Sequence, residues 1–365
     1  MPGPEANTVN VAKMCSAFAA NGCAVTLAAL PGTPAPHLAA EIKRYYHLSC
    51  DFDVAPLPAW AARPSIAALA GAALARRGGA DLAYTRAPHA ALASCLAGVP
   101  SVLEVHTDPA GFGALGLAAY RHAIAHPKLL GVVAISNALA RRLQQDAPRA
   151  PIIVAHDGAD SRTTSAAQAS DVLRVGYVGR FYRGKGLELV GRIAALCPWA
   201  AFHIVGGDRA AAEAVMGMPA PANMNIHGAL PHAEAAAHID GCDIVLAPYQ
   251  RSVIVADGKT DAAAWMSPLK IFEYMAAGKA ILASALPVLR EILEDGANAL
   301  LLPPDDPAPW AAALAALRDN PTRRQALGDR ARADLLARYT WEKRARHILG
   351  ALQQTASPQA QRRSA

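Results

Sequence analysis

The chain has 365 residues, of which 53% are hydrophobic and 18% are charged, so it is too apolar to be a disordered protein and too long for one ordinary domain. The 35 Lys and Arg residues exceed the 29 Asp and Glu residues, which gives a net charge of +6. This modest excess suits anionic small ligands or an anionic membrane surface, and it is too weak to indicate nucleic-acid binding.

Short apolar runs alternate with longer helix-patterned stretches along the first half of the chain. This pattern is typical of strand and crossover-helix units in a parallel sheet. It predicts strands at residues 23–30, 81–85, 101–106, 131–136 and 151–156. A run of small and hydroxyl residues then predicts a linker at 161–172, so the first domain is expected to span 1–160.

A second series of the same kind follows. Its predicted strands lie at 173–179, 201–207, 223–228, 243–249, 280–284 and 298–304. We expect this domain to span 173–338, a C-terminal helix at 339–352 to return toward the first domain, and a flexible polar tail at 353–365. The predicted fold class is α/β, with two Rossmann-like, doubly wound domains facing each other across a cleft. Ligands of such sheets bind beyond the carboxyl ends of the strands.

The loop "GRFYRGKG" follows the first predicted strand of the second domain. Gly179, Gly184 and Gly186 let its backbone turn tightly, and Arg180 and Lys185 add two positive charges. Lysine as a point charge and arginine as a planar fork suit a diphosphate at the start of a helix. The loop therefore predicts an anion site, although a solvated basic loop would have the same composition.

The stretch "SPLKIFEYMAAGKAILAS", residues 267–284, contains a single carboxylate, Glu273, within an apolar helical pattern that Gly278 ends. A carboxylate near such a surface needs a partner, or its pKa shifts. That partner is either a nearby lysine, such as Lys270, or a bound ligand.

These motifs together resemble the retaining glycosyltransferases of family 4, which have the GT-B fold. The resemblance lies in "VGRFYRGKGLELV", "APY" and "SPLKIFEYMAAGKAILASALPVLREILEDGANALLLPPDDP". It continues through "SVLEVHTDP", "VVAISNALARRL" and "IIVAHDGAD" and ends with "YTWEKRA", so it spans nearly the whole chain. The chain resembles in particular members with the "SPLKIFEYMA" form of the block.

The resemblance implies a role for several residues. Arg180 and Lys185 match the pair that holds the donor's pyrophosphate, and Glu273 matches the glutamate that binds the ribose hydroxyls of the nucleotide. His106 of "EVHTDP" matches the histidine beside the reacting sugar, and a histidine satisfied by the backbone is the alternative there. These residues are the expected catalytic and donor-binding groups.

One position departs from the family pattern. Trp265 stands where many members carry a first glutamate, which is separated from the second by seven residues. In the family this first glutamate is associated with the hydroxyls of the donor sugar. In members with the "SPLKIFEYMA" block, main-chain groups of the "MSPL" loop replace it, which makes Ser267 and Leu269 further donor-binding candidates.

The implied activity is retaining transfer of a hexose from a nucleotide-diphosphate sugar, with UDP or GDP as the nucleotide. The acceptor would be a hydroxyl of a saccharide, a lipid-linked sugar or a small molecule, in bacterial polysaccharide or glycolipid synthesis. No metal or other cofactor is expected, because two cations already face the diphosphate and no carboxylate pair stands beside them. The alternatives are a nucleotide-sugar epimerase or glycoside phosphorylase on the same fold, and a non-catalytic binding partner, which Trp265 would favour.

Composition also bears on location and on the start of the chain. The six cysteines form no C-x-x-C pair, no apolar run reaches the ~18 residues of a spanning helix, and the start "MPGPEANTVN" lacks signal-peptide features. We therefore expect a cytoplasmic protein whose membrane contact is peripheral, at the inner membrane face. The resemblance places "PGPEANTVN" after the first strand of the N-terminal sheet, so we expect that strand to be missing and to precede Met1.

Overall fold

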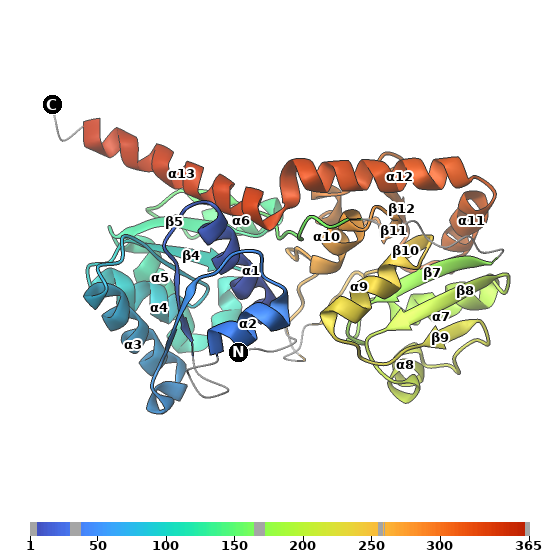
Figure 1. The fold of residues 1–365 in the computed structure, drawn as a ribbon, viewed down its shortest axis with the longest axis horizontal. Coiled ribbons are helices and arrows are strands. Elements are labelled where there is room, and N and C mark those ends of the chain that lie inside the picture. The colour runs from blue at the N-terminus through green and yellow to red at the C-terminus, as the bar shows by residue number, and fades with distance from the viewer. Residues whose placement is uncertain (1–5, 30–37, 164–171, 255–257, 259, 362–365) are drawn as a thin grey trace. The chain divides into compact units, whose positions relative to one another are not determined.

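The protein is described from a computed structural model, which describes residues 6–29, 38–163, 172–254, 258 and 260–361. Most of the predicted linker at 161–172 lies outside these residues, as does the end of the predicted tail. The chain forms two compact units: unit 1 consists of Met1–Asp157 and Trp341–Ala365, and unit 2 consists of Gly158–Thr340 (Figure 1). The chain thus leaves unit 1 once and returns to it with its last helix.

Unit 1 is built from parallel strands with helices between them. Its elements are α1 (Ala6–Ala20), β1 (Thr26–Ala29), α2 (Leu38–Tyr46), β2 (Asp53–Pro56), η2 (Ala59–Ala62), α3 (Pro64–Arg77), β3 (Ala83–Thr85), α4 (Pro88–Leu96), β4 (Ser101–Val105), η3 (Pro109–Phe112), α5 (Gly113–Ala125), β5 (Leu129–Ala134), α6 (Asn137–Gln144), β6 (Ile152–Val154) and α13 (Trp341–Gln361). The described strands form two sheets, β1-β2 and β3-β4-β5-β6, and all their pairings are parallel. A strand upstream of Met1 stays a prediction.

The last helix, α13, packs on unit 1 through one face. Trp341, Ala345, Ile348 and Leu352 recur at helical spacing and are buried. A Cβ added to Gly131 of β5 would stand 3.0 Å from Leu352 Cδ2, so this face lies against the sheet. The helix runs to Gln361, so residues 353–361 of the predicted tail are helical in the structure. Gln and Ala, which are frequent in this stretch, are good helix formers.

Unit 2 contains one parallel sheet with the strand order β12-β11-β10-β7-β8-β9. Its elements are β7 (Leu173–Val178), α7 (Leu187–Leu196), β8 (Ala200–Val205), α8 (Arg209–Met216), β9 (Met224–Ile226), α9 (His232–Asp240), β10 (Ile244–Ala247), α10 (Leu269–Ala276), β11 (Ala280–Ser284), η4 (Leu289–Glu291), β12 (Leu300–Leu302), α11 (Pro307–Arg318), α12 (Pro321–Asp334) and η5 (Leu335–Tyr339). The chain adds β8 and β9 on one side of β7 and then β10, β11 and β12 on the other. The direction of winding therefore reverses between β7 and β10, where sheets of this kind bind ligands.

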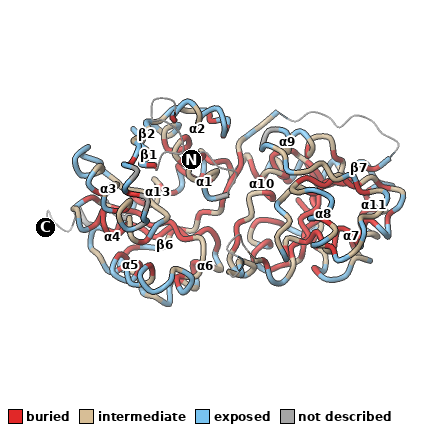
Figure 2. Tube along the Cα trace, turned by 90° about the horizontal axis from the view of Figure 1, so that it is seen from below, coloured by how far each residue is buried: buried red, intermediate tan, exposed pale blue. Residues whose placement is uncertain are grey.

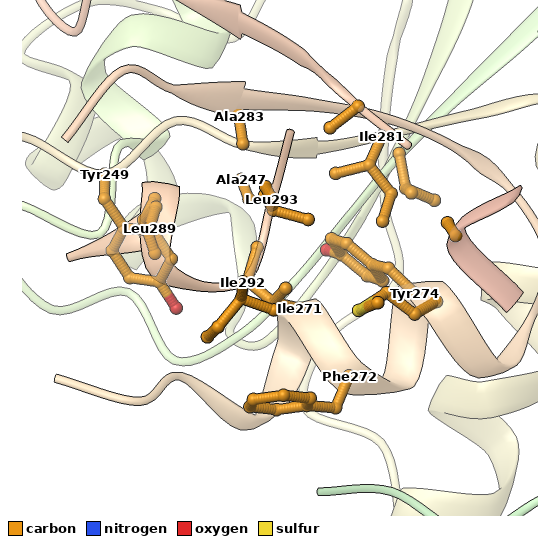
Figure 3. Packing of buried hydrophobic residues seen from close by; sticks show 14 of the residues in the cluster. Ala247, Tyr249, Ile271, Phe272, Tyr274, Ile281, Ala283, Leu289, Ile292 and Leu293 are labelled. Atoms are coloured by element: carbon orange, nitrogen blue, oxygen red, sulfur yellow. The ribbon is translucent and has the colours of Figure 1, made fainter. Parts of the chain in front are cut away.

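The strands of each unit carry most of its core. In Figure 2 the buried residues follow the strands and the inner faces of the helices, and the exposed residues lie on the outer turns. All of β4, β10 and β11 is buried, as expected for parallel strands covered on both faces. Figure 3 shows Ile271 and Tyr274 of α10 pointing toward the sheet, whereas Phe272 points away from it. This packing holds α10 against one face of the sheet.

The predicted parallel α/β architecture is confirmed in both units. In the described part of the chain, no helix combines the length and the hydropathy needed to cross a bilayer.

Candidate functional site

The predicted glycine loop of unit 2 begins directly after β7, at the point where the winding of the sheet reverses. Gly184 and Gly186 have φ values of +83° and +92°, and a Cβ at either residue would stand 1.9 Å from a carbonyl oxygen, that of Ser252 or that of Pro248. The amide of Gln250 donates to the Gly184 carbonyl at 2.8 Å. The loop therefore packs backbone to backbone against the segment after β10, which only glycine at these positions permits.

The end of β8 approaches the same loop. A Cβ at Gly206 would stand 1.9 Å from the carbonyl oxygen of Gly179, and a Cβ at Gly207 would stand 2.6 Å from the Phe181 ring. The amide of Gly179 donates to the Val205 carbonyl at 2.9 Å. The loop is thus in close backbone contact with the segments that follow β8 and β10, at the carboxyl ends of these strands.

The two cations predicted for a diphosphate lie in this loop. Arg180 is exposed, and Lys185 is half-buried with Nζ 4.9 Å from the centroid of the Tyr182 ring. The carbonyl of Lys185 accepts a hydrogen bond from the Tyr177 hydroxyl at 3.2 Å, so the loop backbone is held to β7. Gly186 is the N-cap of α7, so the loop leads directly into a helix N-terminus, where unpaired N–H groups favour an anion.

The donor-binding candidates of the second motif lie on and before α10. Ser267 is buried, Leu269 is the first residue of the helix, and Glu273 is half-buried in its second turn. The Tyr274 hydroxyl accepts from the amide of Val178 at 3.0 Å and lies 3.3 Å from the carbonyl of Leu246, to which it donates. These bonds attach α10 to both strands at the winding reversal, so the glycine loop and α10 occupy the same region of unit 2.

Lys270, the expected alternative partner of Glu273, does not fill that role in the structure. Among the described residues its Nζ has no hydrogen-bond partner, although the side chain is buried. It lies instead over the rings of Tyr177 and Tyr249.

In unit 1, the predicted site residue His106 follows β4 and belongs to a buried polar cluster. Its Nε2 is hydrogen-bonded to Oε1 of Glu104, and the Tyr84 hydroxyl donates to Glu104 Oε2. Arg344 of α13 donates to the same oxygen at 3.1 Å. Glu104 is fully buried and Arg344 is 3% exposed, whereas the side chain of His106 is 19% exposed. His106 is therefore more accessible to a ligand than Glu104 or Arg344.

The charges of the cluster shift the pKa values of its members. Burial alone would raise the pKa of the Glu104 carboxyl, but Arg344 and His106 hold it well below its usual range. Burial, reinforced by the negative charge of Glu104, raises the pKa of the Tyr84 hydroxyl. Glu104 is thus an ionised acceptor that orients His106, and Tyr84 is a neutral donor.

The cluster continues to Asp157, which lies 3.9 Å from Arg344 Nη2 and accepts from Asn10 Nδ2 at 2.8 Å. Glu104, His106 and Asp157 each place one potential metal-ligand atom within 4.8 Å of the others. The guanidinium of Arg344 already faces both carboxylates and supplies the positive charge that a metal ion would otherwise supply. A metal ion there would have to compete with a buried positive charge.

Sequence reasoning singled out His106 but not its neighbours in the cluster, Glu104, Tyr84 and Arg344. A glutamate within the apolar run "SVLEV" was a usable signal, because a buried carboxylate requires a buried partner. Its partner lies on the last helix and could not be found from local spacing. Lys270 was missed as a possible site residue for the same reason, since its surroundings come from strands far away in the sequence.

Comparisons with known proteins agree with this geometry. Residues 8–162 match a family model described as Glycosyltransferase Family 4, and residues 187–350 match one described as Glycosyl transferase-like. A D-inositol 3-phosphate glycosyltransferase from Corynebacterium kroppenstedtii is 37% identical over 76 residues, which are 21% of this chain and 17% of that protein. That match covers only a small part of the relative's length.

Solved structures resemble the whole chain. The sucrose-phosphate synthase of Thermosynechococcus elongatus has a TM-score of 0.71 at 17% identity, over 97% of this chain and 94% of its own. The HepE protein of Anabaena, in complex with UDP and glucose, has a TM-score of 0.70 at 17% identity, over 97% and 96%. At this identity the likeness shows the fold, which is GT-B as expected. The two halves of the chain match two glycosyltransferase models in succession, and the whole fold is that of the GT-B glycosyltransferases.

Proposed function

We propose that the protein is a retaining glycosyltransferase that moves a hexose from a nucleotide-diphosphate sugar to a hydroxyl acceptor. The observation that carries the proposal is the glycine loop with Arg180 and Lys185 at the winding reversal of unit 2, where β7, β8 and β10 end. A related fold has been solved with UDP and glucose bound, which supports a nucleotide-sugar donor.

The proposed donor contacts follow from the chemistry of each group. Arg180 and Lys185 pair with the diphosphate and stabilise the charge that it gains as the glycosyl bond breaks, an effect worth about 3 kcal/mol per donor in other enzymes. Glu273 accepts from the ribose hydroxyls, and main-chain groups of Ser267 and Leu269 contact the sugar. His106, held by Glu104, orients the sugar or the acceptor hydroxyl.

The reaction requires no protein nucleophile in this proposal. The bond to the leaving phosphate loosens, the acceptor attacks from the same face, and the phosphate takes the acceptor's proton. No metal is required, because the two cations of the loop serve the diphosphate. UDP or GDP would be the nucleotide, and the acceptor a saccharide, a lipid-linked sugar or a small molecule in bacterial polysaccharide or glycolipid synthesis.

The proposal also includes the cellular location of the protein. With a net charge of +6 the protein suits a cytoplasmic setting in which it binds peripherally to the anionic inner face of the membrane. Sedimentation with phosphatidylglycerol vesicles at low and high salt tests this part.

The experiment is a thermal-shift screen of sugar nucleotides, since a donor that binds only the folded state raises the melting temperature. Transfer is then measured with the best donor, and the anomeric configuration of the product is determined by NMR. Arg180→Ala, Lys185→Ala and Glu273→Gln should each lower transfer by at least about tenfold, which is ~1.4 kcal/mol. Arg183→Ala, an exposed cation of the same loop, is the matched control. Wild-type turnover in the first three variants would show that the site is elsewhere.

A second candidate is a GT-B protein without this activity, either a binding partner or an enzyme of another kind such as a nucleotide-sugar epimerase. The observation that favours it is Trp265 at the position of the first glutamate. Such a protein would bind a sugar nucleotide without releasing nucleoside diphosphate, or would convert it to an isomeric sugar nucleotide.

A further inference from the structure

Lys270 has a buried amino group without an oxygen partner. It is 7% exposed, it is the second residue of α10, and among the described residues its Nζ has no hydrogen-bond partner. Its surroundings are aromatic, because Nζ lies 4.2 Å from the centroid of the Tyr177 ring and 4.8 Å from that of Tyr249. Ring faces attract a cation, but they replace only part of the hydration that burial removes.

The position of this amino group coincides with the reversal of winding in the sheet. Tyr177 belongs to β7, and Tyr249 follows β10. A Cβ added to Gly179 would stand 3.2 Å from Lys270 Nζ, so the group lies against the backbone of the residue that begins the glycine loop. An unpartnered donor thus lies under the loop that carries the two predicted phosphate-binding cations.

The charged groups around Lys270 do not neutralise it. Burial lowers the pKa of Lys270 well below its usual range, the positive charge of Lys185 lowers it further, and Glu273 on the same helix opposes the shift. The phenols of Tyr177 and Tyr249 are neutral, since burial raises their pKa values. An anion bound near the loop would therefore supply the negatively charged partner that Lys270 lacks among the described residues.

We infer that Lys270 is a third cationic contact for the phosphates of a nucleoside diphosphate, and that its ion-pair partner arrives only with that ligand. The inference rests on the proposed function and adds a residue to the site. It also gives the three cations different roles. Arg180 and Lys185 are accessible and attract the ligand, whereas the buried Lys270 forms its ion pair only after the ligand has bound. The negative charge of the diphosphate opposes the lowering of the Lys270 pKa, so the amine takes up a fraction of a proton from solvent as the ligand binds and returns it when the ligand leaves.

The test is calorimetric titration of the full chain with UDP and GDP, and with uridine and guanosine, in two buffers of different ionisation enthalpy. Wild-type protein should take up as much as about one proton per diphosphate bound and none per nucleoside. Lys270→Met, which keeps the length of the side chain, should weaken diphosphate binding by roughly tenfold or more and abolish the uptake. Its affinity for the nucleoside should stay unchanged.

Lys279→Met is the matched control. Lys279 is 8% exposed, but it donates to the Asp240 carbonyl at 2.7 Å and precedes β11, at the opposite end of the strands. This variant should bind both ligands and take up protons as the wild type does. Lys270→Gln is the second variant, in case the methionine variant does not fold.

The outcomes separate the inference from the proposed function. If a folded Lys270 variant keeps wild-type diphosphate affinity and proton uptake, the inference is wrong and the proposed function stands. If it loses diphosphate and nucleoside affinity by the same factor, Lys270 is structural and the inference is also wrong. If wild-type protein binds neither diphosphate, both proposals fall.

Discussion

Arg344 and Glu104, which are 240 residues apart, form a buried ion pair with a distance of 3.1 Å between Nη1 and Oε2. The other two guanidinium nitrogens also donate, Nε to the carbonyl of His156 at 2.8 Å and Nη2 to that of Ala155 at 3.2 Å. One side chain of α13 therefore holds β4 and the segment after β6. This makes the last helix part of the support of His106.

Loss of the Arg344 side chain should destabilise the protein strongly. Arg344→Met leaves Glu104 buried without its counter-ion, which typically costs about 3–5 kcal/mol, measured as the free energy of unfolding in urea. The double variant Glu104→Leu with Arg344→Met should recover part of that loss, because both charges are gone. Arg346→Met on the exposed face of α13 is the control and should change stability by less than about 0.5 kcal/mol. Equal stability of Arg344→Met and wild type would contradict a supporting role.

The same pair predicts how stability depends on pH. The pKa of Glu104 is well below its usual range in the folded protein and about 4.3 when unfolded. Its contribution is therefore complete above about pH 5 and is lost as the pH falls through 4.3 toward the folded value. The stability difference between wild type and Glu104→Gln, followed by urea unfolding at each pH, should shrink from about pH 6 to about pH 3. A difference that stays constant with pH would mean that ionisation of Glu104 does not contribute to the free energy of unfolding.

His106→Ala should impair transfer more than it weakens nucleotide binding. The histidine is expected beside the sugar, so the loss should appear in kcat, on the order of 10²-fold, with the affinity for the nucleoside diphosphate unchanged. Glu104→Gln should act in the same direction but less, because the amide oxygen still accepts from Nε2. Steady-state kinetics and calorimetry distinguish the two effects, and equal losses in both would indicate a structural role for His106.

Chelation of divalent metal ions should leave transfer unchanged. The cations of the glycine loop and Lys270 are proposed to serve the diphosphate, and Arg344 faces the carboxylates of the metal-like cluster. Initial rates with and without EDTA measure this directly. Loss of activity in EDTA, with recovery on addition of magnesium or manganese, would show that a metal takes part.

Lys270→Met should stabilise the protein in the absence of ligand. The folded-state pKa of Lys270 lies below the unfolded value, so the unfolded chain binds the extra proton and folding becomes less favourable as the pH falls below about 10. Removing the amine removes this cost, so the melting temperature at neutral pH should rise. A fall in the melting temperature would mean that the contacts of Lys270 with the rings of Tyr177 and Tyr249 stabilise the protein by more than burial of its amino group costs.

These residues also show what could be read from the sequence. The strand Ala280–Ser284 was predicted with its observed limits because five apolar or small residues follow a helix-ending glycine. The strand Asp53–Pro56 was missed, because it is short, is exposed at both ends and contains a proline. The glycine loop was found because its residues are consecutive, and the structure places it beside α10. The pairing of Arg344 with Glu104 and the aromatic surroundings of Lys270 arise only from tertiary structure, for which no local pattern exists.

The division of the chain between the two units has a consequence for biosynthesis. Unit 2 is one continuous stretch, Gly158–Thr340, whereas unit 1 lacks α13 until the last residues are made. At ~5–20 residues per second the ribosome adds Arg344 roughly 12–50 seconds after Glu104. During that interval unit 1 holds a carboxylate that cannot be buried with its counter-ion, and unit 2 is synthesised to its last residue, Thr340, shortly before Arg344 is added. The part of the protein that is synthesised first is therefore completed last, and a nascent chain shorter than about 344 residues should expose unit 1 to chaperones and proteases.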